Sequence, residues 1–353
     1  MAKSTAVPGL DVDGLGRWLT REHPELTGEG PLRAALIDGG RSNLTYRVDG
    51  AAVPLVLRRP PLGHVLSTAH DMRREHRVIT ALRGIVPVPP TVDLVDDTGA
   101  GEVTGTDFFV MEHVAGQVLS RPAQNAGWTR GGLRRLGIEL AEVLADLHAV
   151  DPDAVGLGDF GRPSGYLDRQ MTTWRRQYDA SRSRELPALD ALQERLAGSV
   201  PAGGARSGVV HGDYRLDNLI VAGEPGAPRV AAVLDWEMAT LGDPLVDLGM
   251  LGMYWHIREL PGGGAASGAI VPGAGYPEFA EVVDAYAARS GAAVPDLSWY
   301  RAFACYKLAV ILEGIHYRYT GGQTVGEGFD RIGALVAPLA DEGLARASAG
   351  KDA

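Results

Sequence analysis

Short runs of apolar residues, bounded by glycine and proline, fill much of the first third of the chain. Runs of this length predict strands. A glycine pair between the first two runs indicates a hairpin turn. One longer segment, residues 67–84, is predicted to be a helix because it starts at a potential cap, Ser67 or Thr68, and ends at Gly84. The strands are expected within residues 32–40, 43–48, 53–59, 89–97 and 107–114.

From about residue 129 onward the pattern becomes helical. Residues 129–150 repeat apolar side chains at spacings of three and four, the period of a helix with one buried face. Residues 209–221 and 229–239 interrupt this pattern and predict a short β-hairpin. Further helices are expected in residues 166–196 (one helix or two), 277–291 and 297–322.

The two patterns together predict an α+β fold with two lobes. We expect an N-terminal extension in residues 1–31, a small β-rich N-lobe in 32–114, and a larger, mostly helical C-lobe in 115–345. The hinge is expected near residues 111–118. Residues 261–269, rich in glycine and alanine, predict a mobile loop.

The charge balance narrows the class of function. A net charge of −10 argues against general nucleic-acid binding. No apolar run reaches the roughly 18 residues of a membrane span, and the start lacks a signal-peptide core. The single cysteine, Cys305, fits a reducing compartment, so we expect a cytoplasmic location. Lysine occurs only at Lys3, Lys307 and Lys351, so a cationic contact to phosphate between the first two requires an arginine.

The predicted hairpin carries a concentration of polar residues, in the stretch VVHGDYRLDNLIV. Asp213 and Asn218 lie in a turn before the first strand, and Asp235 follows the second. Because the two strands fold back on each other, Asp235 is expected beside Asn218. Carboxylate and amide oxygens suit Mg²⁺, which takes one or two carboxylates and leaves other positions to phosphates and water. The remaining carboxylate can orient a nucleophile, as in phosphoryl transfer. An ordinary turn with capping residues is the alternative.

The stretches HGDYRLDN and LDWE form a pattern that resembles the aminoglycoside phosphotransferase and choline-kinase superfamily, relatives of the protein kinases. The resemblance covers about residues 32–320, and LRRPP resembles in particular the kinase-like domains fused to acyl-CoA dehydrogenases. It implies a bilobal protein-kinase-like fold, ATP and Mg²⁺ as cofactors, and a small hydroxylated molecule as substrate.

The resemblance also implies roles for individual residues. Asp213 is expected to accept the proton of the substrate hydroxyl or to orient it, and Asn218 and Asp235 to hold Mg²⁺. His211 is expected to shape the loop through hydrogen bonds, and Asp247 to brace it. Asp217 is interpreted as a local cap.

The β-rich lobe offers a nucleotide site. Its glycine-containing turn lets the backbone approach phosphate oxygens. On the third strand, Arg58 stands where the superfamily usually has lysine; it is expected to contact the phosphates and to pair with Glu75, because arginine binds phosphate bidentately. Backbone groups of Glu112 and Val114 are expected at the adenine edge. The turn residues predicted to bind phosphate are Gly39, Gly40, Ser42 and Asn43.

Three functions fit these residues: an ATP-dependent small-molecule kinase, which we favour, a nucleotide-binding pseudokinase, and a metal-dependent phosphoester hydrolase. For the kinase, the acceptor is the open question. Residues 166–185, a candidate acceptor-binding insert, carry five arginines against three acidic residues. This excess favours an anionic acceptor, a hydroxy acid or hydroxyacyl-CoA, over a cationic aminoglycoside or choline.

Overall fold

The structure is a computed structural model. The chain divides into two compact units, Met1–Ala115 and Gly116–Ala353. Each unit is described here by itself. The residues that the structure describes are 7–37, 43–62, 71–201, 207–265, 268–322 and 331–349.

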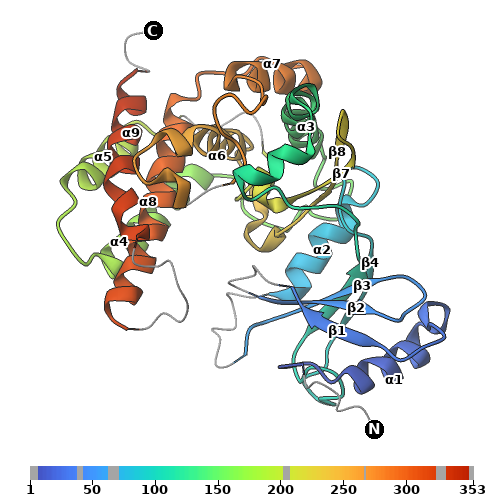
Figure 1. Ribbon diagram of the computed structural model, residues 1–353. Helices are drawn as coiled ribbons and strands as arrows, with labels where there is room; N and C mark the ends of the chain where they lie inside the picture. Colours follow the sequence, from blue (N-terminus) through green and yellow to red (C-terminus); the bar gives the residue numbers. More distant parts are fainter. Residues whose placement is uncertain are drawn as a thin grey trace. The chain divides into compact units, whose positions relative to one another are not determined.

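The first unit is built on an antiparallel sheet of five strands in the order β1-β2-β3-β5-β4 (Figure 1). All five strands expected from the sequence are present, and β1 and β2 pair as the predicted hairpin. The helix expected between the third and fourth strands is also present, as α2 (Met72–Leu82). The strands are β1 (Arg33–Leu36), β2 (Leu44–Asp49), β3 (Leu55–Arg59), β4 (Thr91–Val95) and β5 (Phe108–Glu112).

The start of α2 differs from the prediction. Its N-cap is Asp71, whose side chain accepts the backbone N–H of Arg74 at 2.9 Å. Ser67 and Thr68, the expected caps, lie outside the described residues. All three residue types can cap a helix, so composition alone did not select among them.

Alternation along the strands separates two faces of the sheet. On β2, Tyr46 and Val48 are buried in one apolar core together with Leu57 of β3. Because side chains alternate along a strand, the next residue of β3, Arg58, points to the opposite face. On that face it meets Glu75 of α2. Arg58 and α2 therefore lie on the face of the sheet opposite the core that contains Tyr46 and Leu57.

Residues 1–31, expected as an extension, contribute to this core. They include a helix, α1 (Val12–Glu22), whose Leu15, Trp18 and Leu19 are buried against the Tyr46 side of the sheet. The spacing of these three side chains is that of one helix face.

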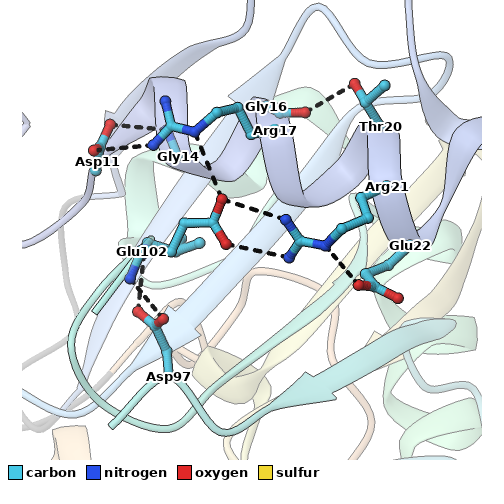
Figure 2. A network of polar contacts seen from close by, with 10 residues as sticks. Asp11, Gly14, Gly16, Arg17, Thr20, Arg21, Glu22, Asp97 and Glu102 are labelled. Carbon is cyan, nitrogen blue, oxygen red and sulfur yellow. Dashed lines mark hydrogen bonds and ion pairs between the residues drawn. The ribbon is translucent and has the colours of Figure 1, made fainter. Parts of the chain in front are cut away.

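Ion pairs also join α1 to the connection between β4 and β5 (Figure 2). Glu102 lies 3.6 Å from Arg17 and 3.1 Å from Arg21, and its own N–H donates to Asp97 at 2.8 Å. The arginines are exposed, so burial of the apolar face of α1 contributes more to its position than these pairs.

The second unit is mostly helical (Figure 1). The helices expected from the sequence are present, and the segment 166–196 forms two helices, with Pro187 at the first position of the second. The helices are α3 (Arg130–His148), α4 (Tyr166–Ser181), α5 (Pro187–Ala197), α6 (Leu245–His256), α7 (Phe279–Ser290), α8 (Ser298–Thr320) and α9 (Val336–Ala349).

Two of these helices, α6 and α9, were not predicted. Every residue of α6 from Leu245 to Trp255 is buried, so its sequence carries no amphipathic pattern that would identify it. In the part of the chain that the structure describes, no helix is long and apolar enough to cross a membrane.

Two small sheets complete the second unit. The predicted hairpin is β7 (Leu219–Glu224) with β8 (Ala227–Val233), and only Pro225 and Gly226 separate its strands. It packs beside α3 (Figure 1). The N–H of Val230, on β8, donates to the side chain of Glu139, on α3, at 2.9 Å. The second sheet pairs β6 (Gly208–Val210) with β9 (Thr240–Gly242) and places the loop that precedes β7.

Candidate active site

The loop between β6 and β7, residues 211–218, carries the predicted catalytic residues. His211 and Leu216 are buried, whereas Asp213 and Asn218 are half-buried. The buried members fix the loop and leave the two polar side chains accessible to a ligand. The pairing of β6 with β9, which the sequence did not reveal, fixes where the loop begins.

The hairpin brings Asp235 to the loop, as predicted. Leu219 pairs with Val233, so the start of β7 lies opposite the end of β8. The backbone N–H of Leu234 then donates to the carbonyl of Asn218 at 2.8 Å. Asn218 and Asp235 therefore belong to backbone segments that are hydrogen-bonded to each other.

Asn218 is also tied to Asp213. Its side-chain Nδ2 donates to the Asp213 carboxylate oxygen Oδ2 at 3.0 Å and to the Asp213 backbone carbonyl at 2.9 Å. Both contacts use the amide nitrogen, so the amide oxygen of Asn218 is directed away from Asp213. These hydrogen bonds fix the position of the Asn218 side chain relative to Asp213.

Asp235 has an unusual backbone. Its φ is 66°, and among the residues that the structure describes it is the only non-glycine residue with a positive φ. This conformation costs about 1 kcal/mol for a non-glycine residue and persists where the surrounding structure enforces it. Such strain is concentrated at functional sites in proteins generally, and the half-buried Asp235 side chain is consistent with that pattern.

The side chain of Asp247 holds the backbone of the loop through hydrogen bonds, as expected. It is fully buried and accepts the backbone N–H groups of His211 at 2.6 Å and Gly212 at 2.8 Å. His148 lies 3.3 Å from the same carboxylate. Burial opposes the ionised form, but the contact with His148 and the two amides hold the pKa of Asp247 below its ordinary value.

His211 shapes the loop through both ring nitrogens. Nδ1 accepts the N–H of Asp213 at 3.2 Å, and Nε2 lies 2.9 Å from the carbonyl oxygen of Leu234. A carbonyl only accepts and an amide N–H only donates, so these contacts fit the neutral tautomer protonated at Nε2. The expectation that His211 organises the loop is confirmed by this geometry.

Asp217 was interpreted as a local cap, but the N-cap of the short helix Leu216–Asn218 is Arg215 and no side chain caps it. The Asp217 carboxylate accepts a hydrogen bond from Arg215 at 3.0 Å, and the Arg215 guanidinium lies 4.6 Å from the ring centre of Tyr254. Burial raises the pKa of Asp217, and the positive charge of Arg215 opposes that shift. Asp217 therefore helps to join the catalytic loop to α6.

In the first unit, Arg58 and Glu75 form the predicted ion pair. Arg58 Nε donates to Glu75 Oε2 at 2.9 Å, and the two side chains are 13% and 3% exposed. Arg58 also donates to the hydroxyl of Thr45 at 3.2 Å. Asn43 is buried at the start of β2. The other turn residues predicted to bind phosphate, Gly39, Gly40 and Ser42, lie outside the described residues.

The backbone groups expected at the adenine edge, those of Glu112 and Val114, lie at the end of β5 and just after it. The N–H of Glu112 donates to the carbonyl of Pro90 at 2.8 Å, which leaves only its own carbonyl for a ligand. The N–H of His113 is also used, by Pro54 at 2.9 Å. Within the described residues, no hydrogen bond involves the backbone of Val114. One acceptor and one donor are thus available at the two predicted positions.

The oxygen atoms of Asn218 and Asp235 at the hairpin are of the kind that binds a small hard cation. Among the residues that the structure describes, no group of three or more His, Cys, Asp or Glu side chains could hold a metal ion. Asn218 and Asp235 instead offer one amide oxygen and one carboxylate. Mg²⁺ is commonly bound by so few protein ligands when phosphates and water supply the rest.

One residue that contacts the loop could not be recognised from the sequence. Lys307 was noted only as one of three lysines, but its ammonium group donates to the Gly212 carbonyl at 2.7 Å. Its isolation among arginines was the only signal, and it did not indicate a location.

Comparisons with known proteins identify the family and the fold. Residues 33–303 match the model of the phosphotransferase enzyme family. A solved structure described as a "putative aminoglycoside phosphotransferase", from Ralstonia eutropha, is 34% identical, with a TM-score of 0.79 over 96% of this chain and 99% of that one. The GDP complex of aminoglycoside 2'-phosphotransferase-IIIa shares the fold, with a TM-score of 0.62 at 15% identity over 95% and 99% of the two chains.

A curated relative of known name is longer than this chain. Acyl-CoA dehydrogenase family member 11 of Gallus gallus is 35% identical over 95% of this chain, which spans 43% of that protein. The family match covers most of this chain, and the relationship to the Ralstonia eutropha structure extends over nearly all of both chains. The chain described here therefore belongs to the phosphotransferase enzyme family and has its protein-kinase-like fold.

Proposed function

We propose that this chain is an ATP-dependent small-molecule kinase that transfers the γ-phosphoryl group to a substrate hydroxyl in the presence of Mg²⁺. The observation that carries the proposal is the arrangement at the hairpin. Asn218 donates to the Asp213 carboxylate, and its carbonyl receives the N–H of Leu234, the residue before Asp235. This arrangement supports a role for Asp213 as proton acceptor and for Asn218 and Asp235 as oxygen ligands, the groups that phosphoryl transfer requires.

In this proposal Asp213 acts on the nucleophile. The hydrogen bond from Asn218 Nδ2 occupies Oδ2 and fixes the orientation of the carboxylate. Oδ1 is then the atom that orients the substrate hydroxyl and receives its proton. Asn218 Oδ1 and the Asp235 carboxylate would hold Mg²⁺, which when bound neutralises negative charge on the nucleotide phosphates.

The first unit would bind the nucleotide. Arg58 is fixed by Glu75 and Thr45, so its guanidinium is already oriented for phosphate contacts. Asn43 and the turn before it would add contacts to phosphate, and the Glu112 carbonyl and Val114 N–H would contact the adenine edge. The presence of Asp213, Asn218 and Asp235 together favours a catalytic role over the pseudokinase alternative, whereas the Arg58–Glu75 pair would serve nucleotide binding in either case.

The acceptor is proposed to be a hydroxy acid or hydroxyacyl-CoA. The support comes from the similarity to acyl-CoA dehydrogenase family member 11, which covers nearly the whole of this chain. An aminoglycoside remains the second candidate, because the Ralstonia eutropha structure carries that description.

The arginine excess of residues 166–185 gives less support to an anionic acceptor than the sequence alone indicated. The arginines of residues 166–185 are largely committed to partners within this chain. Arg184 pairs with Glu313 at 2.9 Å, Arg182 with Asp190 at 2.8 Å, and Arg175 with Asp179 at 3.9 Å. Arg169 donates to the backbone carbonyls of Arg162 and Ser164. A net positive count therefore does not translate into a cationic surface for a ligand.

One experiment tests donor, acceptor and reaction together. The chain is incubated with Mg-ATP and, side by side, hydroxyacyl-CoAs, free hydroxy acids, aminoglycosides and choline. ADP release and the mass of the phosphorylated product are measured. We expect ADP release that depends on the hydroxyacyl substrates. Turnover confined to the cationic alcohols would reject the proposed acceptor, and nucleotide binding without turnover on any acceptor would favour the pseudokinase.

A further inference from the structure

Lys307 is a buried charge at an unexpected place. It lies in the middle of α8, where its side chain is 4% exposed. The residues around it in this helix are mostly apolar and also buried. Burying an ammonium group costs several kcal/mol unless other groups compensate. The contacts of Lys307 show which groups do so.

The Lys307 ammonium has one hydrogen bond and one aromatic neighbour in the described part of the chain. Nζ donates to the backbone carbonyl of Gly212 at 2.7 Å and lies 5.3 Å from the ring centre of Trp174, on α4. Burial lowers the pKa of Lys307, and the negative charges of Asp213 and Asp247 oppose that shift. The cation is therefore directed at the catalytic loop.

The Gly212 carbonyl belongs to the peptide group that leads directly into Asp213. Lys307 holds this peptide group by its C=O, and His211 Nδ1 accepts its N–H, that of Asp213, at 3.2 Å. The preceding peptide N–H, of Gly212, is held by Asp247 at 2.8 Å. Lys307 and His211 thus fix the orientation of the peptide group that leads into Asp213, and Asp247 fixes the peptide group before it.

Gly212 itself does little to restrain the backbone here, because glycine populates positive and negative φ about equally. Its φ is +87°, a region that favours glycine, and a Cβ there would meet Met238 atoms at 2.9 Å. This conformation directs the Gly212 carbonyl toward α8. If the carbonyl were not held, the peptide group and Asp213 with it would have freedom to rotate.

We propose that Lys307 is a positioning residue for phosphoryl transfer, which sets the orientation of Asp213 by holding the Gly212 carbonyl. The inference rests on the proposed function, in which Asp213 acts on the acceptor hydroxyl. Lys307 acts through the backbone and requires no contact with nucleotide or acceptor.

The first test replaces Lys307 and separates turnover from stability. Lys307→Met removes charge and donor but retains an unbranched side chain. We expect kcat to fall by roughly tenfold to a hundredfold, the scale of a small displacement of a catalytic group, with the Kd for Mg-ATP unchanged. We expect Tm to stay the same or rise, because an apolar group in place of a buried charge often stabilises a fold. Lys307→Gln retains an N–H donor and is expected to recover part of the lost kcat.

Glu313 provides the matched control. It is a fully buried charge on the same helix, but it pairs with Ser183 and Arg184 instead of the loop. Glu313→Gln is expected to lower Tm and to leave kcat largely unchanged. Wild-type kcat in Lys307→Met, or an equal loss of kcat in Glu313→Gln, overturns the proposal. If Lys307→Met does not fold, Lys307→Gln is compared with the control by the same criteria.

A second measurement is independent of turnover. Amide hydrogen exchange is followed in a peptide that covers residues 209–216. Lys307→Met is expected to exchange faster there than wild type and Glu313→Gln, and equal exchange overturns the proposal. If wild type phosphorylates no acceptor, the proposed function fails, yet the exchange result still decides whether Lys307 holds the loop.

Discussion

Arg58 donates a hydrogen bond to Glu75 over 2.9 Å, and both side chains are largely removed from solvent. The pair joins the middle of the sheet to α2, and it places a permanent cation where the superfamily usually has a lysine. Its geometry connects the proposed nucleotide site to the stability of the first unit, because removing either partner leaves the other charge buried.

Replacement of Arg58 should therefore affect both properties. If the guanidinium contacts two phosphates in the transition state, Arg58→Ala is expected to lower kcat by roughly a hundredfold or more. It should also destabilise the unit by about 3 kcal/mol, since the buried Glu75 carboxylate loses the guanidinium that contacts it. Steady-state kinetics and urea unfolding measure the two effects. Arg73→Ala, which removes an exposed arginine of α2, is the control. Wild-type turnover in Arg58→Ala would exclude Arg58 from the site.

The division of roles between Asp213 and Asp235 leads to a second prediction. Asp213→Asn is expected to leave Mg-ATP binding nearly intact and to remove most turnover, because no group is left to accept the proton of the nucleophile. Asp235→Asn is expected to weaken nucleotide binding only when Mg²⁺ is present. Nucleotide titrations with and without Mg²⁺, together with kcat, separate the two. Indistinguishable behaviour in both assays would contradict the proposed roles.

Asp247 is expected to affect stability more than chemistry. Asp247→Asn replaces one of the oxygens that accept the loop amides of His211 and Gly212 with a donor, in a fully buried position. The loss should be about 3 kcal/mol in the free energy of unfolding, measured with urea. Where the variant is folded, kcat should fall by a much smaller factor than in Asp213→Asn. A stable protein with greatly reduced turnover would show instead that Asp247 acts in the reaction.

Asp97 makes stability depend on pH in a defined direction. It is buried and accepts the backbone N–H groups of Glu102, Val103, Thr104 and Gly105. Burial opposes the ionised form, but these amides together hold the pKa of Asp97 below its ordinary value. The stabilisation is therefore complete above the ordinary pKa of about 4 and is lost as pH falls through the lower pKa of the folded state.

The corresponding measurement compares wild type with Asp97→Asn. The difference in Tm should be largest near pH 6 and should shrink as the pH is lowered toward 3. An unchanged difference over that range would show that ionisation of Asp97 does not contribute.

The sequence by itself determined the elements that carry the site. Short apolar runs specified the five strands of the sheet, whereas the register of β2 on β3, seen only in the structure, puts Arg58 on the opposite face from Tyr46. The positions of Asn218 before the first strand of the hairpin and Asp235 after the second predicted their proximity, because two antiparallel strands joined by a tight turn bring the start of one beside the end of the other. These relationships are local, or they follow from strand period.

Only the tertiary structure decided how the loop is held. Asp247 and Lys307 reach residues 211–213 from α6 and α8, and His148 of α3 contacts Asp247. No local pattern connects such distant segments. The helices α6 and α8 are buried on nearly all sides, so their sequences contain no amphipathic phase to show which side chain faces the loop. The charge excess of residues 166–185 is a weaker guide for a similar reason: composition counts charges, but packing determines which of them are paired with a neighbour.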